Sequence, residues 1–199
     1  PKNLDEALDG LLILYSHVPS ITTFPVYIGR LDMLLDPFIT DEEQDYIKIK
    51  RFLNHVDKTV PDSFCHANIG PYDTKAGRLI LKAVIELEAP TPNMTIRYDK
   101  SKTSREFAEL AAKACLLVSK PSFANDAYYI SDLGEQYGIA SCYNALPECG
   151  GAYTLTRLRL GTIARACKTV DEMVNELLPR VAKCALSTMD KRHKFVVEE

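Results

Sequence analysis

Apolar residues recur every three or four positions over several long stretches of this chain, and shorter apolar runs lie between them. In the first stretch the leucine spacing predicts a helix over 3–18, opened by Asn3 with Glu6 three places on and ended by Pro19. Three later threonine–glutamate pairs have the spacing of capping boxes: Thr40 with Glu43, Thr103 with Glu106 and Thr169 with Glu172. The helices expected on these grounds lie at 40–58, 74–87, 103–120, 128–136 and from 169 onward, with a kink at Pro179.

The shorter apolar runs have the features of strands. Residues 64–70 end at a glycine and are typical of a buried strand that feeds a loop, and residues 94–98 alternate apolar and polar positions. Residues 153–160 lean towards β structure, whereas 21–35 predicts an irregular extended connection followed by a short helical turn. Strands separated by helices of this length favour an α/β fold with parallel pairing over a helical bundle.

The composition narrows the class of protein. With 46% hydrophobic and 26% charged residues and a net charge of -3, the chain is neither disordered nor suited to nucleic acid. No apolar run approaches the roughly 20 residues of a membrane span, and no signal peptide is recognisable, so we expect a cytoplasmic protein.

No internal repeat or linker is visible, which predicts one domain over 1–199. Because the chain starts without Met and stops within a helical pattern, we interpret it as a fragment of a longer protein.

The stretch 138–151 carries a thiol in a short, bent loop. Pro147 restricts φ and a terminal diglycine permits unusual backbone angles, so the loop can aim Cys142 in a defined direction. From these residues alone Cys142 has three interpretations: a buried structural thiol, a nucleophile or a carrier of hydrogen atoms. A redox pair with Cys149 is a further option. The six cysteines contain no C-x-x-C pair, so we expect no metal site.

Two residues near the end of the predicted strand at 64–70 are candidates for a pocket. His66 suits acid–base chemistry, although a histidine satisfied by local hydrogen bonds is the more frequent case. Asn68, like Asn125 and Asp126 further on, follows an apolar stretch, where α/β scaffolds place functional groups. These three residues suit turns and helix caps equally well, and the sequence leaves the alternatives open.

Six blocks stand in a particular order along the chain: IGRLD at 28–32, DPF at 36–38, ANIG at 67–70, PNMTIR at 92–97, PSFAND at 121–126 and YGIASCYNALP at 137–147. Their order and separation resemble those of the glycyl radical enzymes, and the resemblance runs nearly from end to end. Within that family the chain is similar to the functionally undefined YjjI-type branch, above all in the last block.

The resemblance implies a ten-stranded α/β barrel made of two half-barrels, of which this chain supplies roughly the first half with the cysteine loop at 138–151. It also implies a mechanism. A backbone glycyl radical takes hydrogen from a cysteine thiol, here Cys142, and the thiyl radical then abstracts hydrogen from a small-molecule substrate. A thiol S–H and a glycine Cα–H between amides are close enough in strength for reversible exchange, and a closed barrel protects the radicals.

Around the cysteine the chain departs from the better-known branches of the family. Asn144 stands where dehydratases and eliminases have a glutamate base, and Tyr143 stands where pyruvate formate-lyase has a second cysteine. Neither established chemistry therefore transfers cleanly to this chain. The resemblance to the family implies a reaction of the lyase, eliminase or acyl-transfer type, with the subtype and substrate open. Glu148 is a candidate base if the loop folds back, since radical eliminations need proton transfer, although a solvent-facing glutamate is the simpler interpretation.

The family's glycyl radical loop has no counterpart in residues 1–199. We therefore expect the fragment to be inactive alone and to bind no cofactor, with the radical installed on the missing part by an S-adenosylmethionine-dependent activating enzyme. Anaerobic metabolism and a homodimer of the complete protein are further implications of the resemblance. The alternative is a non-catalytic α/β binding or scaffolding domain whose thiols are incidental.

Overall fold

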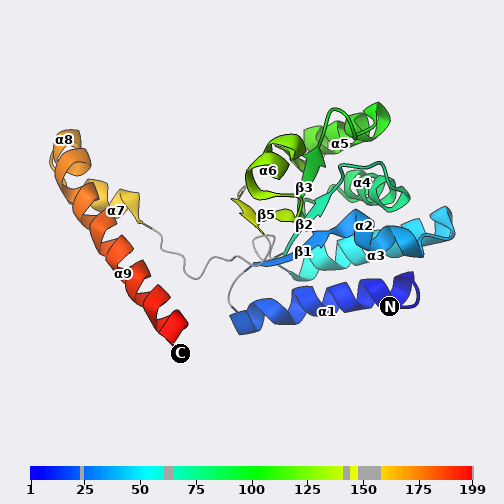
Figure 1. Ribbon diagram of the computed structural model, residues 1–199, viewed down its shortest axis with the longest axis horizontal. Helices are drawn as coiled ribbons and strands as arrows, with labels where there is room; N and C mark the ends of the chain where they lie inside the picture. Colours follow the sequence, from blue (N-terminus) through cyan, green and yellow to red (C-terminus); the bar gives the residue numbers. More distant parts are fainter. Residues whose placement is uncertain (23–24, 61–64, 141–143, 148–157, 199) are drawn as a thin grey trace. The chain divides into compact units, whose positions relative to one another are not determined.

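The computed structural model describes residues 1–22, 25–60, 65–140, 144–147 and 158–198 (Figure 1). Its internal contacts divide the chain into two compact units, Pro1–Cys149 and Gly150–Glu199, and each is described by itself. The expectation of a single domain over 1–199 stays a prediction.

A four-stranded parallel sheet forms the centre of the first unit. Its strands follow one another in chain order: β1 (Val26–Arg30), β2 (Cys65–Ile69), β3 (Asn93–Tyr98) and β4 (Ser122–Asn125). Parallel neighbours need a crossover. The crossovers run through α2 (Leu31–Leu35) with α3 (Glu42–Thr59), then α4 (Lys75–Leu87), then α5 (Arg105–Val118). This arrangement confirms the predicted α/β class.

The long helices form one layer against the sheet. Helix α3 packs against α4, α4 packs against α5, and α1 (Leu4–Thr22) packs against α3 and β1 (Figure 1). Crossovers of one hand place the helices on the same face when the strands follow in chain order, whereas a reversal of strand order would divide them between both faces. The four described strands are therefore singly wound.

The main apolar core lies between this helical layer and the sheet. All five residues of β2 are buried, and Ile80 and Val84 of α4 and Phe107 of α5 are fully buried. The larger of two apolar clusters contains Ile80, Val84 and Phe107 together with Cys65, Ala67 and Ile69 of β2, and the smaller one lies around β5. Full burial of one large apolar side chain contributes about 1.5–3 kcal/mol. Because the larger cluster contains most of these side chains, packing of the helical layer against the sheet is the main source of apolar stabilisation.

The remaining elements complete the two units. In the first, α6 (Asp126–Leu133) leads into two antiparallel strands, β5 (Tyr137–Ala140) and β6 (Asn144–Pro147), which pair Ala140 with Asn144. A 3-10 turn, Asp36–Phe38, follows α2. The described part of the second unit contains α7 (Leu160–Arg165), α8 (Val170–Glu172), a π-helical segment (Met173–Leu177) and α9 (Leu178–Glu198).

Four strands correct the sequence-based expectations. The irregular connection predicted at 21–35 contains β1, which pairs with β2 around an irregularity at Gly29, where φ is +81°. Residues 122–125 form β4, although so short a segment carries little local signal. Both strands arise because neighbouring backbone supplies the pairing partners. Strands β5 and β6 occupy part of the predicted loop at 138–151, so that loop is partly a paired ribbon.

Two predicted helix caps move by one residue. Asp41 caps α3 in place of Thr40, and its carboxylate accepts two backbone N–H bonds while complementing the helix dipole. Ser104 caps α5 in place of Thr103, whose hydroxyl accepts a hydrogen bond from the Asp99 N–H instead. Each cap position is therefore decided by competition between adjacent polar side chains.

The helix end predicted at Pro19 is wrong, whereas the kink at Pro179 stays a prediction. Helix α1 continues through Pro19 to Thr22, because the φ of proline suits a helix and its ring removes only one hydrogen bond from 19 residues. In the second unit the Thr169 cap is confirmed, with its hydroxyl accepting from the Glu172 N–H at 3.1 Å. The wide π-helical segment lies directly before α9, where Pro179 cannot supply an N–H.

Candidate functional site

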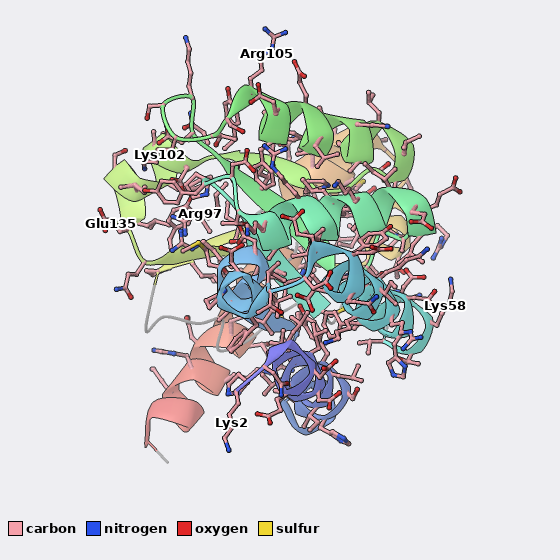
Figure 2. All side chains as sticks on the ribbon, turned by 90° about the vertical axis from the view of Figure 1, so that its right-hand side faces the viewer. Lys2, Lys58, Arg97, Lys102, Arg105 and Glu135 are labelled. Atoms are coloured by element: carbon pink, nitrogen blue, oxygen red, sulfur yellow. The ribbon has the colours of Figure 1, made fainter. Side chains whose placement is uncertain are left out.

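Polar side chains from β2 and β3 meet the segment that leads into the cysteine stretch. Cys65, Ala67 and Ile69 of β2 belong to the main core, and because successive side chains of a strand alternate, Asn68 points the other way. In the register of the sheet Asn68 pairs with Thr95, so Arg97 of β3 lies on the same face as Asn68. Figure 2 shows Arg97 within the body of the unit, whereas Lys58 and Arg105 reach outward.

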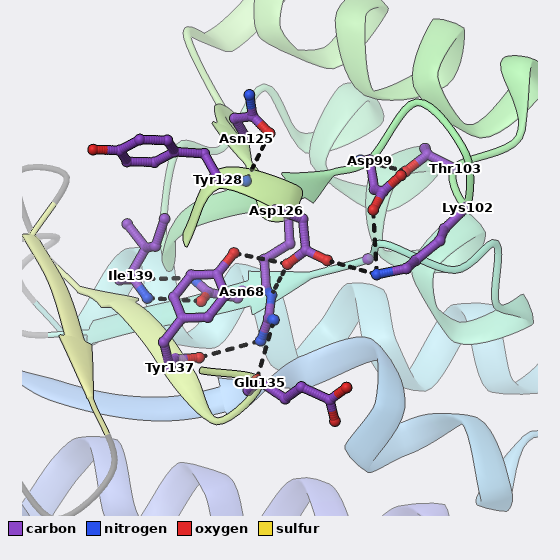
Figure 3. A network of polar contacts seen from close by, with 12 residues as sticks. Asn68, Asp99, Lys102, Thr103, Asn125, Asp126, Tyr128, Glu135, Tyr137 and Ile139 are labelled. Carbon is purple, nitrogen blue, oxygen red and sulfur yellow. Dashed lines mark hydrogen bonds and ion pairs between the residues drawn. The ribbon is translucent and has the colours of Figure 1, made fainter. Parts of the chain in front are cut away.

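Asn68 binds the backbone of β5 through its side-chain amide. Its Nδ2 donates to the Ile139 carbonyl at 2.8 Å, and its Oδ1 accepts the Ile139 N–H at 2.9 Å (Figure 3). The Tyr27 hydroxyl donates to the same Oδ1 at 2.8 Å. Asn68 is fully buried, so these partners replace water for its amide.

Tyr27 and Gly138 are packed so closely that a side chain at position 138 would have to displace the Tyr27 ring. A Cβ on Gly138 would lie 2.2 Å from the Tyr27 ring, well inside van der Waals contact. Burial raises the pKa of Tyr27 to about 12, so its hydroxyl stays protonated and can donate to Asn68 at neutral pH. The glycine therefore permits the contact that orients Asn68.

Arg97 binds both ends of the connection between α6 and β5. Its Nε donates to Asp126 Oδ1 at 2.7 Å, and its other nitrogens donate to the carbonyls of Tyr137 and Glu135 at 3.1 and 3.4 Å (Figure 3). The guanidinium lies 3.9 Å from the centre of the Tyr137 ring. The Tyr137 hydroxyl donates to Asp126 Oδ1 at 2.7 Å, and burial raises the pKa of Tyr137 above its usual range.

A second cation balances the charge of this cluster. Lys102 Nζ lies 3.2 Å from Asp99 Oδ2 and 3.5 Å from Asp126 Oδ2, at the end of β3 (Figure 3). Hydrogen bonds from Ser101 lower the pKa of Asp99 to about 2. Asp126 Oδ2 accepts no hydrogen bond in the described part of the chain, so it depends on the charges of Lys102 and Arg97.

Asp32 is a second buried carboxylate on the loop side of the sheet. Its Oδ2 accepts the Gly70 N–H at 2.8 Å and the Thr74 hydroxyl at 3.3 Å, whereas its Oδ1 has no hydrogen-bond partner among the described residues. Burial raises its pKa to about 6. With Asp36, which accepts the Ala76 N–H at 3.0 Å, it ties the blocks at 28–38 to the start of α4.

The predicted site residues fall into three groups. His66 and Asn68 are buried in β2, and the Tyr15 hydroxyl donates to the His66 carbonyl at 2.9 Å. Asn144 is the first residue of β6, and its side chain lies outside what the structure describes. Cys142, Tyr143 and Glu148 lie outside the described residues, as does Cys149 of the suggested redox pair.

The residues that sequence reasoning missed are the clamp around β5. Asp126 was a candidate from its position, but Tyr27, Arg97 and Tyr137 carried no local signal of their partners. An arginine inside a buried strand is rare enough to have marked Arg97, since a charged side chain there needs a partner. Among the residues that the structure describes, no group of three or more histidine, cysteine or acidic residues is arranged to hold a metal ion.

Comparisons with known proteins identify the family. A family model described as "Glycyl radical enzyme YjjI-like" matches residues 1–199. The chain belongs to this family. The resemblance of the sequence blocks is thereby confirmed for the whole chain. No solved structure gives a significant match.

Two relatives extend this result. The chain is 93% identical over 199 residues to an uncharacterized protein of Haemophilus influenzae and 42% identical over 201 residues to the uncharacterized protein YjjI of Escherichia coli. Each match covers the whole chain and 39% of the relative. The chain thus spans less than half the length of these YjjI-like proteins. Among its described helices, none has the length and apolar character needed to cross a membrane.

Proposed function

We propose that this chain is part of a glycyl radical enzyme in which Cys142 carries hydrogen between a radical glycine and a small-molecule substrate. The observation that carries the proposal is the match of the YjjI-like family across all 199 residues. The glycyl radical takes the hydrogen atom of the Cys142 thiol, which restores the glycine and leaves a thiyl radical. The thiyl radical takes hydrogen from the substrate, and the product radical recovers it later.

The fold is compatible with the half-barrel part of this proposal. A singly wound parallel sheet with helices on one face is the repeating unit from which α/β barrels are built. Strand β4 ends the described sheet, and the proposed complete barrel continues beyond it. The radical glycine, the activating enzyme that uses S-adenosylmethionine, and a cytoplasmic homodimer working in anaerobic metabolism belong to the same proposal.

The chemistry of the substrate step follows from residues near the cysteine. We propose that Tyr143 and Asn144 line the substrate pocket in place of a second cysteine or a glutamate base, with Glu148 and His66 as acid–base candidates. Substrate or acid–base contact by Asn68 remains a prediction, and its amide already bonds Tyr27 and Ile139. No observation on the described residues favours a non-catalytic binding domain.

The test is anaerobic activation of the complete protein by its activating enzyme, followed by electron paramagnetic resonance. A glycyl radical signal in the wild type, and turnover in a substrate screen that Cys142→Ala abolishes while keeping the radical, is the expected result. A complete protein that acquires no organic radical under conditions that reduce and cleave S-adenosylmethionine contradicts the proposal.

A further inference from the structure

Among the described residues, the backbone of Ile139 is bound to the parallel sheet by one side chain, that of Asn68 in β2. Successive residues of a strand direct their N–H and C=O groups to opposite edges, so Gly138 and Ala140 face β6 while Ile139 faces away from it. Both backbone groups of Ile139 are taken by the Asn68 amide, at 2.8 and 2.9 Å. One side chain thus does what a neighbouring strand would otherwise do.

The direction of the Asn68 amide is decided by its partners. The Ile139 carbonyl needs a donor and the Ile139 N–H needs an acceptor, which assigns Nδ2 and Oδ1 respectively. The Tyr27 hydroxyl adds a second donor to Oδ1, and its ring lies against Gly138, the residue before Ile139. The Tyr27–Asn68 pair therefore determines the distance between β5 and the parallel sheet. It also determines which residue of β5 lies opposite Asn68 of β2.

The bonds between Asn68 and Ile139 are buried, which makes the attachment specific. Asn68 is fully buried, and Ile139 and Tyr137 are 2% and 4% exposed. When a buried amide loses one partner, water cannot replace it, so a shift of β5 by one residue would leave Asn68 and Ile139 both unsatisfied. Arg97 reinforces the same segment from the Tyr137 carbonyl.

We propose that Asn68 and Tyr27 are positioning residues for hydrogen transfer by Cys142. Cys142 follows Ala140, the last residue of β5, by two positions, so the anchored strand determines where the thiol-bearing segment begins. Transfer of a hydrogen atom needs the reacting atoms about 3–3.5 Å apart, and an error of about 1 Å costs roughly 100-fold in rate. The inference rests on the proposed function, because the position of the thiol matters only if Cys142 carries hydrogen.

The experiment measures hydrogen exchange rather than turnover. In D₂O the thiol becomes S–D, and each reversible transfer between thiol and glycine can leave deuterium on the glycine α-carbon. The splitting of the radical signal by the α-hydrogen is then lost. The rate of this loss reports the distance between glycine and thiol, needs no substrate, and is measured on the complete, activated protein.

The variants separate positioning from stability. Both Asn68→Leu and Tyr27→Phe are expected to keep the radical signal. We expect Asn68→Leu to slow the exchange at least tenfold and Tyr27→Phe to slow it roughly threefold. Matched controls are Asn175→Leu and Tyr46→Phe, whose polar groups bond only to Asp171 and Glu86 in the described structure and should leave the rate unchanged. Asn68→Asp is the second test, since a protonated carboxyl offers the donor and acceptor of the amide, and exchange should recover as the pH falls.

The outcomes distinguish the positioning role from the proposed function. Wild-type exchange rates in Asn68→Leu and in Asn68→Asp at every pH overturn the positioning role while the proposed function stands. Loss of exchange in Cys142→Ala together with slowed exchange in Asn68→Leu supports both. Absence of a radical in the activated wild type overturns the proposed function and this inference with it. If Asn68→Leu fails to fold, the pH-dependent recovery of Asn68→Asp decides.

Discussion

The two faces of the parallel sheet are held to their neighbours by different kinds of contact. On the helical face, many buried apolar side chains, such as Leu53 and Ile80, pack together through contacts that have no preferred direction. On the face that meets α6 and β5, a few directed polar contacts do the work, centred on Asn68 and Arg97. The first face makes the fold stable, whereas the second specifies the path of one segment.

The largest expected effect is the loss of the buried ion pair. Arg97→Met removes the nearest cation from the buried Asp126 side chain, which should reduce the free energy of unfolding by about 3–5 kcal/mol. Urea unfolding of the complete protein measures the change. The double variant Arg97→Met/Asp126→Leu should recover most of the loss, and a double variant as unstable as the single one would show that the arginine acts through packing instead.

A core truncation on the helical face tests the other half of the comparison. Leu53→Ala removes a fully buried side chain of α3 and should cost about 2–5 kcal/mol of unfolding free energy. The orientation of β5 should be unaffected, so amide hydrogen exchange at Ile139 in the native state should change no more than global unfolding requires. Selective loss of protection at Ile139 would mean that the two faces are coupled.

Asp32 makes the stability of the folded chain depend on pH. Its pKa of about 6 in the folded chain exceeds the ordinary value, so the folded protein binds the proton more tightly and its stability falls as the pH rises from about 4 to above 6. The change is up to about 3 kcal/mol, at roughly 1.4 kcal/mol for each unit of pKa. Asp32→Asn should lack this change, and a difference between wild type and variant that is constant from pH 4 to 7 contradicts the prediction.

The smallest effect is expected at Gly138. An added methyl group meets the Tyr27 ring, which can swing aside only by giving up its bond to Asn68, so Gly138→Ala should cost about 1–3 kcal/mol. Thermal and urea unfolding measure the loss. In a Tyr27→Ala background the same substitution should cost almost nothing. An equal cost in both backgrounds would place the obstruction elsewhere.

Sequence patterns were reliable where the cause was local. Thr74 caps α4 through the Gly77 N–H, Asn3 caps α1 through the Glu6 N–H, and the apolar run at 64–70 contains β2. They were unreliable where two neighbours compete, as Asp41 does with Thr40. They also missed β1 and β4, because short strands are stabilised by pairing with distant backbone.

The sequence by itself determined the α/β order of elements, the starts of most helices and membership of the YjjI-like glycyl radical enzyme family. It also singled out Cys142, whose proposed role awaits experiment. Only the tertiary structure decided that Asn68 bonds Ile139, 71 residues away, and that Arg97 closes on Asp126 and Tyr137. Hydrogen-bond partners brought together by parallel strand order leave no periodic trace in the chain, because a buried polar group specifies that it needs a partner and not which residue supplies it.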